Sequence, residues 1–256
     1  MDRHKPVLLE VRKERLDVLL VKRGLVESKE KAKVLIFAGK VKGKDGETLR
    51  KPSFRIWSDS EIIIEKGIEY FSRGYLKLKK AFSDFGIDIS GKICVDIGSS
   101  TGGFVQYLLE RGAKKVYAVD VGKGLLHEKL RREDRVYLLE GFNARYLTPE
   151  VFERVGDGEV PEFATVDVSF ISSTLIIKAL SNIVKECLVL VKPNFELAKR
   201  FVKKGLVKDE RLHRDAVRLV KEYAERLGFF TKGITESEPK GAKGNKEFFI
   251  WMGKNI

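Results

Sequence analysis

From residue 92 onward, apolar runs of strand length alternate with amphipathic stretches of helical length. We expect strands near 93–97, 115–120, 136–140, 163–168, 186–192, 229–234 and 247–252, with helices between the first six. Such alternation predicts a mostly parallel sheet covered by helices on both faces. No helix fits between the last two strands, so we expect that pair to be antiparallel. The prediction is an α/β fold with a seven-stranded sheet that contains a reversed strand.

The first part of the chain, residues 1–66, follows a different pattern. Amphipathic helices are expected over 15–23 and 28–37, the second with a serine cap at its start, and short strands should follow. Residues 67–76 show no clear periodicity and are expected to connect the small α+β domain to a larger domain, residues 77–256.

One glycine-rich turn carries the strongest chemical signal of the chain. Directly after an apolar strand the sequence reads Asp96-Ile97-Gly98-Ser99-Ser100-Thr101-Gly102-Gly103-Phe104. A strand that ends in an acid and a glycine-rich turn, and then enters a helix, lets the backbone approach a small charged cofactor. The glycine spacing does not match the dinucleotide pattern, and the Lys-Ser/Thr ending of a phosphate-binding loop is missing. The turn therefore indicates S-adenosylmethionine rather than NAD or ATP.

Three polar residues at strand ends are candidates for holding that cofactor. Asp120 ends the second strand, where doubly wound folds place the carboxylate that binds the ribose hydroxyls. Asp96 could meet the methionine end, directly or through water. Asn143 follows the third strand, where the adenine is often contacted. Each of the three could instead cap the turn that follows it.

The charge of the chain points to a polyanionic partner. There are 50 Lys plus Arg against 37 Asp plus Glu, a net charge of +13. Nucleic acid is the partner that such a surface attracts, although many of these cations could simply be solvated. The candidate RNA-binding side chains are Arg15, Lys29, Lys33, Lys40, Lys42, Arg73, Lys199 and Arg200.

Targeting signals and reactive cysteines are not evident. The amino terminus is polar, and no stretch approaches the length of a membrane span, so neither export nor a membrane partner is expected. Cys94 and Cys187 lie in apolar strand patterns, as buried, reduced thiols of a cytoplasmic protein would. We expect no metal and no protein partner.

Several motifs resemble known families. The segments Arg15-Leu16-Asp17-Val18-Leu19-Leu20, Ser28-Lys29-Glu30-Lys31-Ala32 and Ile36-Phe37-Ala38-Gly39-Lys40-Val41 resemble the alpha-L RNA-binding domain, of the type found in ribosomal protein S four. The remainder resembles FtsJ-type ribose methyltransferases in Ser72-Arg73-Gly74, Asp167-Val168-Ser169-Phe170-Ile171-Ser172, Val191-Lys192-Pro193-Asn194-Phe195-Glu196 and Gly244-Asn245-Lys246-Glu247. In this order the two parts resemble the TlyA family, also called hemolysin A, of rRNA ribose methyltransferases. Two positions depart from the family: Tyr75 replaces a glycine, and Asn194 replaces a glutamine.

The resemblance implies a Rossmann-like class I methyltransferase fold, S-adenosylmethionine as the cofactor, and ribosomal RNA or ribosomal subunits as the partner. It assigns a catalytic tetrad to Lys77, Asp167, Lys192 and Glu247. The predicted cofactor site, at the glycine turn and the neighbouring strand ends, consists of Asp96, Gly98, Ser99, Ser100, Gly102, Gly103, Phe104, Asp120, Val121 and Asn143. Three of the tetrad residues adjoin strand ends at one edge of the sheet, so all four could converge above the cofactor.

The chemistry of the tetrad suits methyl transfer to a ribose 2′-hydroxyl. That reaction needs an in-line approach and removal of a poorly acidic proton, and it needs no metal. Burial and a second ammonium from Lys77 would favour the neutral amine that a base requires, so Lys192 is either the base or a steering group.

Other functions can be weighed against this one. Amino-group methyltransferases carry prolines after the fourth strand that are missing here, and carbon-5 methylation needs a nucleophilic cysteine at a strand end. A noncatalytic RNA-binding or ribosome-assembly factor that keeps the fold remains an alternative. A membrane-lysing role has no support, because no amphipathic segment of membrane-inserting size is evident.

Overall fold

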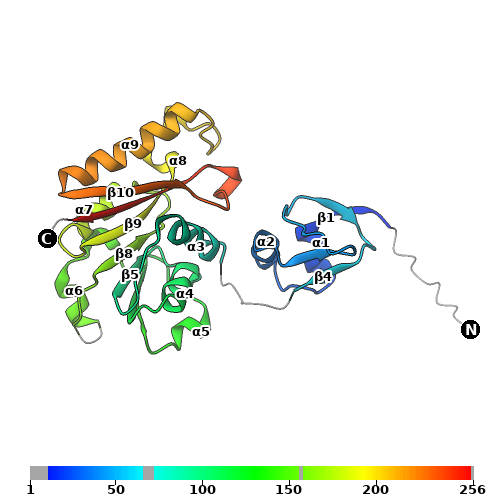
Figure 1. Ribbon diagram of the computed structural model, residues 1–256, viewed down its shortest axis with the longest axis horizontal. Coiled ribbons are helices and arrows are strands. Elements are labelled where there is room, and N and C mark those ends of the chain that lie inside the picture. The colour runs from blue at the N-terminus through cyan, green and yellow to red at the C-terminus, as the bar shows by residue number, and fades with distance from the viewer. Residues whose placement is uncertain (1–10, 66–71, 156–157, 255–256) are drawn as a thin grey trace, which may run out of the picture. The chain divides into compact units, whose positions relative to one another are not determined.

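The computed structural model describes residues 11–65, 72–155 and 158–254. It divides into two compact units, Met1–Arg73 and Gly74–Ile256 (Figure 1). Helix α3 (Gly74–Phe85) opens the second unit, so the last three residues of the predicted connection, 74–76, are helical. Residues 67–71 of that connection lie outside the described residues.

The amino-terminal unit is a small α+β domain. Its elements are β1 (Lys13–Arg15), α1 (Leu16–Lys22), α2 (Lys29–Phe37), β2 (Val41–Gly43), β3 (Arg55–Trp57) and β4 (Ile62–Ile64). Ser28 caps α2, because its hydroxyl accepts a hydrogen bond from the Lys31 N–H at 3.2 Å. The two helices pack through Leu16, Leu20 and Ile36, and two antiparallel ribbons, β1–β3 and β2–β4, complete the unit.

The second unit is built on one seven-stranded sheet. Its strands are β5 (Ile93–Ile97), β6 (Lys115–Asp120), β7 (Val136–Glu140), β8 (Phe163–Val166), β9 (Glu186–Val191), β10 (Phe229–Glu236) and β11 (Phe248–Lys254). The spatial order is β10-β11-β9-β8-β5-β6-β7. Strands β5 to β9 are parallel, and β11 is antiparallel to both of its neighbours. The fold class and the antiparallel final pair are therefore confirmed.

Helices cover both faces of this sheet (Figure 1). The intervening elements are α4 (Gly103–Glu110), α5 (Glu128–Arg131), η1 (Ala144–Tyr146), α6 (Pro149–Arg154), α7 (Thr174–Leu180), α8 (Pro193–Glu196), η2 (Lys199–Phe201), α9 (Glu210–Arg226) and η3 (Ala242–Gly244). On one face Phe82 of α3 packs edge-on against Tyr107 of α4. On the other face α7 and α9 bury Ile177 and Val220 against the strands. Because both faces are covered, the parallel strands are almost entirely apolar.

The chain path creates a crevice in the middle of the sheet. After β5 the chain builds β6 and β7 on one side, and it then returns to place β8 on the other side. In open α/β sheets, ligands bind at the carboxyl ends of the strands at such a reversal. The topology therefore predicts a binding site above β5 and β8.

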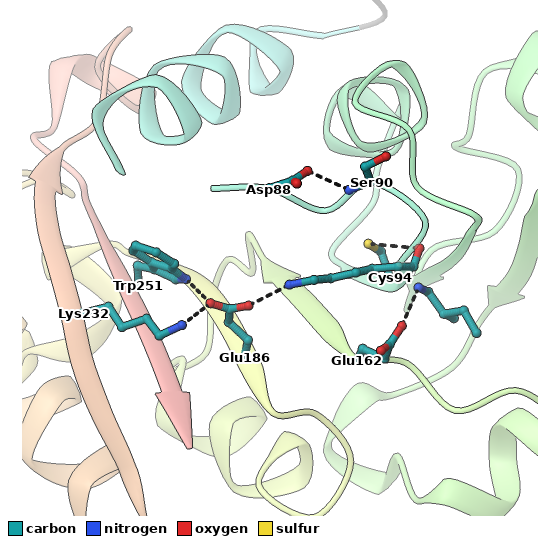
Figure 2. Close-up of polar contacts among 9 residues, drawn as sticks. Asp88, Ser90, Cys94, Glu162, Glu186, Lys232 and Trp251 are labelled. Atoms are coloured by element: carbon teal, nitrogen blue, oxygen red, sulfur yellow. Dashed lines mark hydrogen bonds and ion pairs between the residues drawn. The ribbon is translucent and has the colours of Figure 1, made fainter. Parts of the chain in front are cut away.

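At the opposite edge of the sheet, one carboxylate joins three elements. Glu186, at the start of β9, accepts hydrogen bonds from Lys92 at 3.0 Å, from Lys232 at 2.5 Å and from the indole N–H of Trp251 at 2.9 Å (Figure 2). Burial alone would raise the pKa of Glu186, but the hydrogen bonds of Lys232 and Lys92 outweigh it, so the pKa is lowered. The ionised form of Glu186 therefore stabilises the folded state.

Replacement of this carboxylate should destabilise the second unit. We expect Glu186→Gln to lower the free energy of unfolding at pH 7 by about 1–3 kcal/mol, since two ammonium groups lose a partly buried partner. Because the folded-state pKa of Glu186 is lowered, its contribution is present above the unfolded pKa of about 4.3 and is lost as the pH falls through the folded value. Urea unfolding at pH 7 and at about pH 3 tests both points. Glu133→Gln is the control, since its pair with Arg135 is exposed and should contribute little.

Candidate active site

A cavity of about 350 Å³ lies at the carboxyl ends of β5, β6 and β8. Its walls come from the turn after β5, from Asp120 and Val121 at the end of β6, from the segment around Asn143 after β7, and from residues 167–171 after β8. Its volume is at the lower end of the range of small-molecule sites. The cavity therefore coincides with the crevice that the topology predicts.

Gly98 allows the backbones of two strand ends to approach each other. Its φ is +85°, and a Cβ at this position would lie 2.4 Å from the carbonyl oxygen of Asp167. Any side chain would force these two segments apart, which explains why glycine stands here. The turn is also anchored to β6, because the Gly98 N–H donates to the Val119 carbonyl at 2.9 Å.

Asp120 both lines the cavity and caps the two loops beside it. Its carboxylate accepts hydrogen bonds from the Ser100 N–H at 2.9 Å and from the Gly122 N–H at 2.7 Å. Each carboxylate oxygen has two acceptor sites, so capacity remains for ribose hydroxyls. The two functions weighed from the sequence are thus compatible.

The other predicted cofactor residues separate into two groups. Those that line the cavity are Gly98, Ser100, Asp120, Val121 and Asn143. Those that are buried and do not line it are Asp96, Ser99, Gly102, Gly103 and Phe104. Gly102 serves packing, since a Cβ there would lie 2.2 Å from a methyl carbon of Leu130. Asn143 also caps η1, accepting from the Arg145 N–H at 3.2 Å.

Asp96 lies beneath the cavity wall rather than in it. Its side chain is fully buried, and one oxygen accepts a hydrogen bond from the Thr165 hydroxyl at 2.6 Å. The other oxygen has no hydrogen-bond partner within the described part of the chain. Burial raises the pKa of Asp96 to about 8, with smaller contributions from the charges of Asp167 and Asp120. Burial thus favours the protonated form of this carboxyl. A contact of Asp96 with the methionine end, directly or through water, stays a prediction.

The four tetrad residues form two ion pairs. The ammonium of Lys77 lies 2.5 Å from a carboxylate oxygen of Glu247, and that of Lys192 lies 2.5 Å from Asp167. The register of β9 and β11 pairs Val191 with Phe248, so Glu247 lies beside Lys192. The Asp167 N–H donates to the last carbonyl of β5 at 2.9 Å, which places this pair next to the glycine turn. The structure thus brings all four side chains to one edge of the sheet, each ammonium with its own carboxylate.

Hydrogen bonds tie the loop after β8 to the end of β9. Lys192 also donates to the Ser169 hydroxyl at 2.9 Å. Glu196 accepts from the Ser172 hydroxyl at 2.5 Å and from the Ser173 N–H at 2.8 Å. These bonds fix residues 167–173, the segment that carries Asp167 into the cavity wall.

The structure adds residues that the sequence prediction missed. Phe142 and Arg145 line the cavity, as does Phe170, which is 87% exposed. Phe170 adopts the left-handed conformation with φ +68°, which is unusual for an aromatic residue, and its ring centroid lies 5.2 Å from that of Phe195. It belongs to the Asp-Val-Ser-Phe motif, so the motif was the signal that could have identified it.

The predicted RNA-binding cations differ in whether an acidic side chain pairs with them. Arg15 makes a bidentate pair with buried Asp17, and Lys33 pairs with Glu30. Lys40 and Lys42 both lie near Glu65, at 3.9 and 3.8 Å. Three other cations form no ion pair with any residue that the structure describes. They are Lys29 on α2, and Lys199 and Arg200 on η2. Arg73 is the last residue of the first unit, so the eight side chains are divided between the two units.

Comparison with known families explains this arrangement. The model of the FtsJ-like methyltransferase family matches residues 70–254, and that of the S4 domain matches residues 14–62. The chain belongs to the FtsJ-like methyltransferase family. S-adenosylmethionine is therefore its cofactor, as the glycine turn predicted. The structure fits this group: Gly98 and Ser100 of the turn line the cavity, the carboxylate-bearing Asp120 lines it as well, and its volume of about 350 Å³ lies within the range of small-molecule sites.

Several relatives of this FtsJ-like methyltransferase are similar over nearly the whole chain. A candidate rRNA methyltransferase of Bacillus subtilis, YqxC, is 44% identical over 251 residues, which is 95% of this chain and 88% of the relative. The 16S/23S rRNA (cytidine-2′-O)-methyltransferase TlyA of Mycobacterium tuberculosis is 39% identical over 247 residues, which is 94% of this chain and 90% of the relative. The structure of a candidate hemolysin from Streptococcus thermophilus superposes with a TM-score of 0.72 at 41% identity, covering 95% of this chain and 89% of that one. The resemblance to the TlyA family is confirmed.

Two further observations bear on the alternatives. Burial raises the pKa of Cys94 and of Cys187 to about 12, so neither thiol is a nucleophile at neutral pH. Within the described residues, the helices are too short or too polar to span a membrane.

The assignment of Asp120 can be tested through cofactor affinity. We expect Asp120→Asn to weaken S-adenosylmethionine binding by about 1.5–3 kcal/mol, on the order of tenfold to a hundredfold in Kd, because a charged acceptor for ribose hydroxyls is lost. Calorimetric titration measures this. Glu140→Gln is the matched control: Glu140 ends the neighbouring strand and accepts from the Gly124 N–H, but it does not line the cavity. Equal affinities in the two variants would remove Asp120 from the cofactor site.

Proposed function

We propose that this methyltransferase transfers a methyl group from S-adenosylmethionine to a ribose 2′-hydroxyl of ribosomal RNA. The observation that carries the proposal is the Asp167–Lys192 ion pair beside the glycine turn, at the wall of the cofactor cavity. The names of the relatives support ribosomal RNA as the substrate, and the S4 domain supports docking on structured RNA. The place of action is then the cytoplasm, where ribosomal RNA is found.

The two ion pairs suit a reaction that joins a cation and a neutral hydroxyl. When bound, S-adenosylmethionine supplies an electrophilic methyl group on a sulfonium. Two ammonium groups and two carboxylates cancel formally, so the site adds no excess positive charge that would repel the cofactor. The side chains of Lys77 and Glu247 are only 9% and 5% exposed, so this pair is shielded from competing water.

Lys192 is the residue to which we assign the action on the ribose hydroxyl. Its ammonium is held by Asp167 and Ser169, both of which line the cavity. Lys192 either removes the hydroxyl proton as the methyl group is transferred or donates a hydrogen bond that orients the oxygen. Glu247 lies next to Lys192 by the register of β9 and β11, and Lys77 pairs with Glu247.

Phe170 provides a surface for the base of the target nucleotide. It projects from the cavity wall, it is 87% exposed, and Phe195 supports one side of the ring. A nucleotide that turns its ribose into the cavity loses stacking on its neighbours, and an exposed aromatic ring compensates for the lost stacking. Phe170 is therefore placed to hold an extruded base while its ribose meets Lys192.

Replacement of Lys192 tests the catalytic assignment. We expect Lys192→Ala to lower kcat for rRNA methylation by at least about a hundredfold while the affinities for cofactor and RNA change little, because the contact serves mainly the transition state. Lys192→Arg should also fail, since a guanidinium stays protonated and its planar fork does not replace a compact amine. Single-turnover methylation of ribosomal subunits that lack the modification measures both.

Controls and pH distinguish the remaining possibilities. Lys254→Ala, at the other end of the strand that Glu247 precedes, should leave turnover unchanged. A rate that rises with pH identifies Lys192 as a base, and a rate that falls over the same range identifies a steering ammonium. Substantial turnover in Lys192→Ala would overturn the assignment. RNA binding without methyl transfer by the unaltered protein would instead identify a noncatalytic factor.

The division of labour between the units can also be tested. We expect deletion of residues 1–73 to leave cofactor affinity within about twofold, because the cavity lies wholly in the second unit, and to weaken rRNA binding by more than about tenfold through lost phosphate contacts. Filter binding and calorimetry measure the two affinities. Methylation of ribosomal subunits by the truncated protein at the full rate would refute a docking function for the first unit.

A further inference from the structure

The β1–β3 ribbon of the amino-terminal unit has one covered face and one exposed face. Its antiparallel register places Lys13 opposite Trp57. It also places Arg15 opposite Arg55. Side chains alternate along a strand, so these four share one face, and all four are exposed. Ile56 points the other way and packs against the core of the unit. We call the exposed side, made of these three cations and the tryptophan, the ribbon face.

Trp57 is the central feature of the ribbon face. It is 50% exposed, and the ammonium of Lys13 lies 5.1 Å from the centroid of its ring. A large aromatic ring left half in water, beside a cation, is typical of a binding surface rather than of core packing. A nucleotide presents the matching groups, since its base can stack on the indole while its phosphate forms an ion pair with the ammonium of Lys13.

The charge of the ribbon face favours a polyanion. Arg15 is held by a bidentate pair with Asp17, whereas no acidic side chain of the described residues pairs with Arg55 or Lys13. Glu14 lies between Lys13 and Arg15 along the strand, so it points to the opposite face, where it meets Lys22. Lys13, opposite Trp57, and Arg55, two residues before it on the same strand, therefore add positive charge to the ribbon face that no ion pair among the described residues offsets.

We propose that the ribbon face binds an unpaired nucleotide of the RNA substrate, with its base stacked on Trp57 and its flanking phosphates held by Lys13 and Arg55. The inference rests on the proposed function, because it takes RNA as the partner. The base must be unpaired, since a paired base offers no free face to an indole. Strands of three residues give too small an area for a stable protein partner, which favours RNA.

The chain contains a built-in probe for this contact. Trp57 and Trp251 are its two tryptophans. Trp251, in the other unit, donates a hydrogen bond to Glu186 (Figure 2) and contacts the ring of Phe85. In full-length Trp251→Phe, fluorescence excited at the tryptophan band reports on Trp57 alone. The protein is titrated with a short single-stranded RNA of mixed sequence and with the same RNA as a duplex. The same protein with Trp57→Phe added contains no tryptophan and supplies the blank. We expect quenching by the single strand and little by the duplex.

Kinetics on ribosomal subunits that lack the modification give the second readout. We expect Trp57→Ala to raise the KM for the subunit on the order of tenfold, with kcat and the Kd for S-adenosylmethionine unchanged, and Trp57→Phe to retain most of the affinity because a phenyl ring still stacks. Phe230→Ala is the matched control: it removes an exposed aromatic side chain from a strand of the other unit, near the end opposite the cavity.

The outcomes separate this inference from the proposed function. Equal quenching by single strand and duplex would overturn base stacking. So would an unchanged KM in Trp57→Ala, which would mean that another segment of the chain or a protein covers the ring. If the unaltered protein methylates a ribose and Trp57→Ala behaves identically, only the ribbon inference fails. If the unaltered protein binds S-adenosylmethionine but methylates no ribose, the proposed function fails, and the quenching still reports on the ribbon face.

Discussion

The approach of Gly98 to the backbone of Asp167 is the constraint on which the site depends. Strands β5 and β8 are neighbours, and the chain diverges from them in opposite directions. Their ends can stay within contact only because Gly98 has no side chain, since a Cβ would lie 2.4 Å from the Asp167 carbonyl. This contact holds the glycine turn over one wall of the cavity and holds Asp167 where it can pair with Lys192. Binding and chemistry are therefore set by the same backbone geometry.

The charges around the cavity are balanced within the fold before any ligand arrives. Each lysine of the tetrad has a carboxylate 2.5 Å away, and burial raises the pKa of Asp96 to about 8, which favours its neutral form. Such balance suits a site that accepts a cationic cofactor. The net positive charge of the chain is carried elsewhere, on exposed cations of both units, which can attract RNA without disturbing the site.

Much of this could be predicted from the sequence, for definite reasons. The alternation of strand and helix patterns predicted the parallel sheet, and the lack of room for a helix between the last strands predicted their antiparallel pairing, which the structure confirms. Asp120 was identifiable because strand ends in such sheets share one edge, and it does line the cavity. Helix α3 was not predicted, and its first turn, Gly74 to Leu76, falls in the expected connection, because glycines there suggested a loop.

The sequence by itself determined the fold class, the cofactor and the edge of the sheet where the cavity lies, since periodicity and strand-end residues are local properties. Tertiary structure decided which groups meet. It buried Asp96 away from the cavity, paired each lysine with a particular carboxylate, and exposed Phe170 and Trp57. Lys77 and Glu247 form an ion pair although they are 170 positions apart in the sequence. No local pattern encodes such a contact, because strand order and register, which bring distant residues together, are set by the packing of the entire sheet.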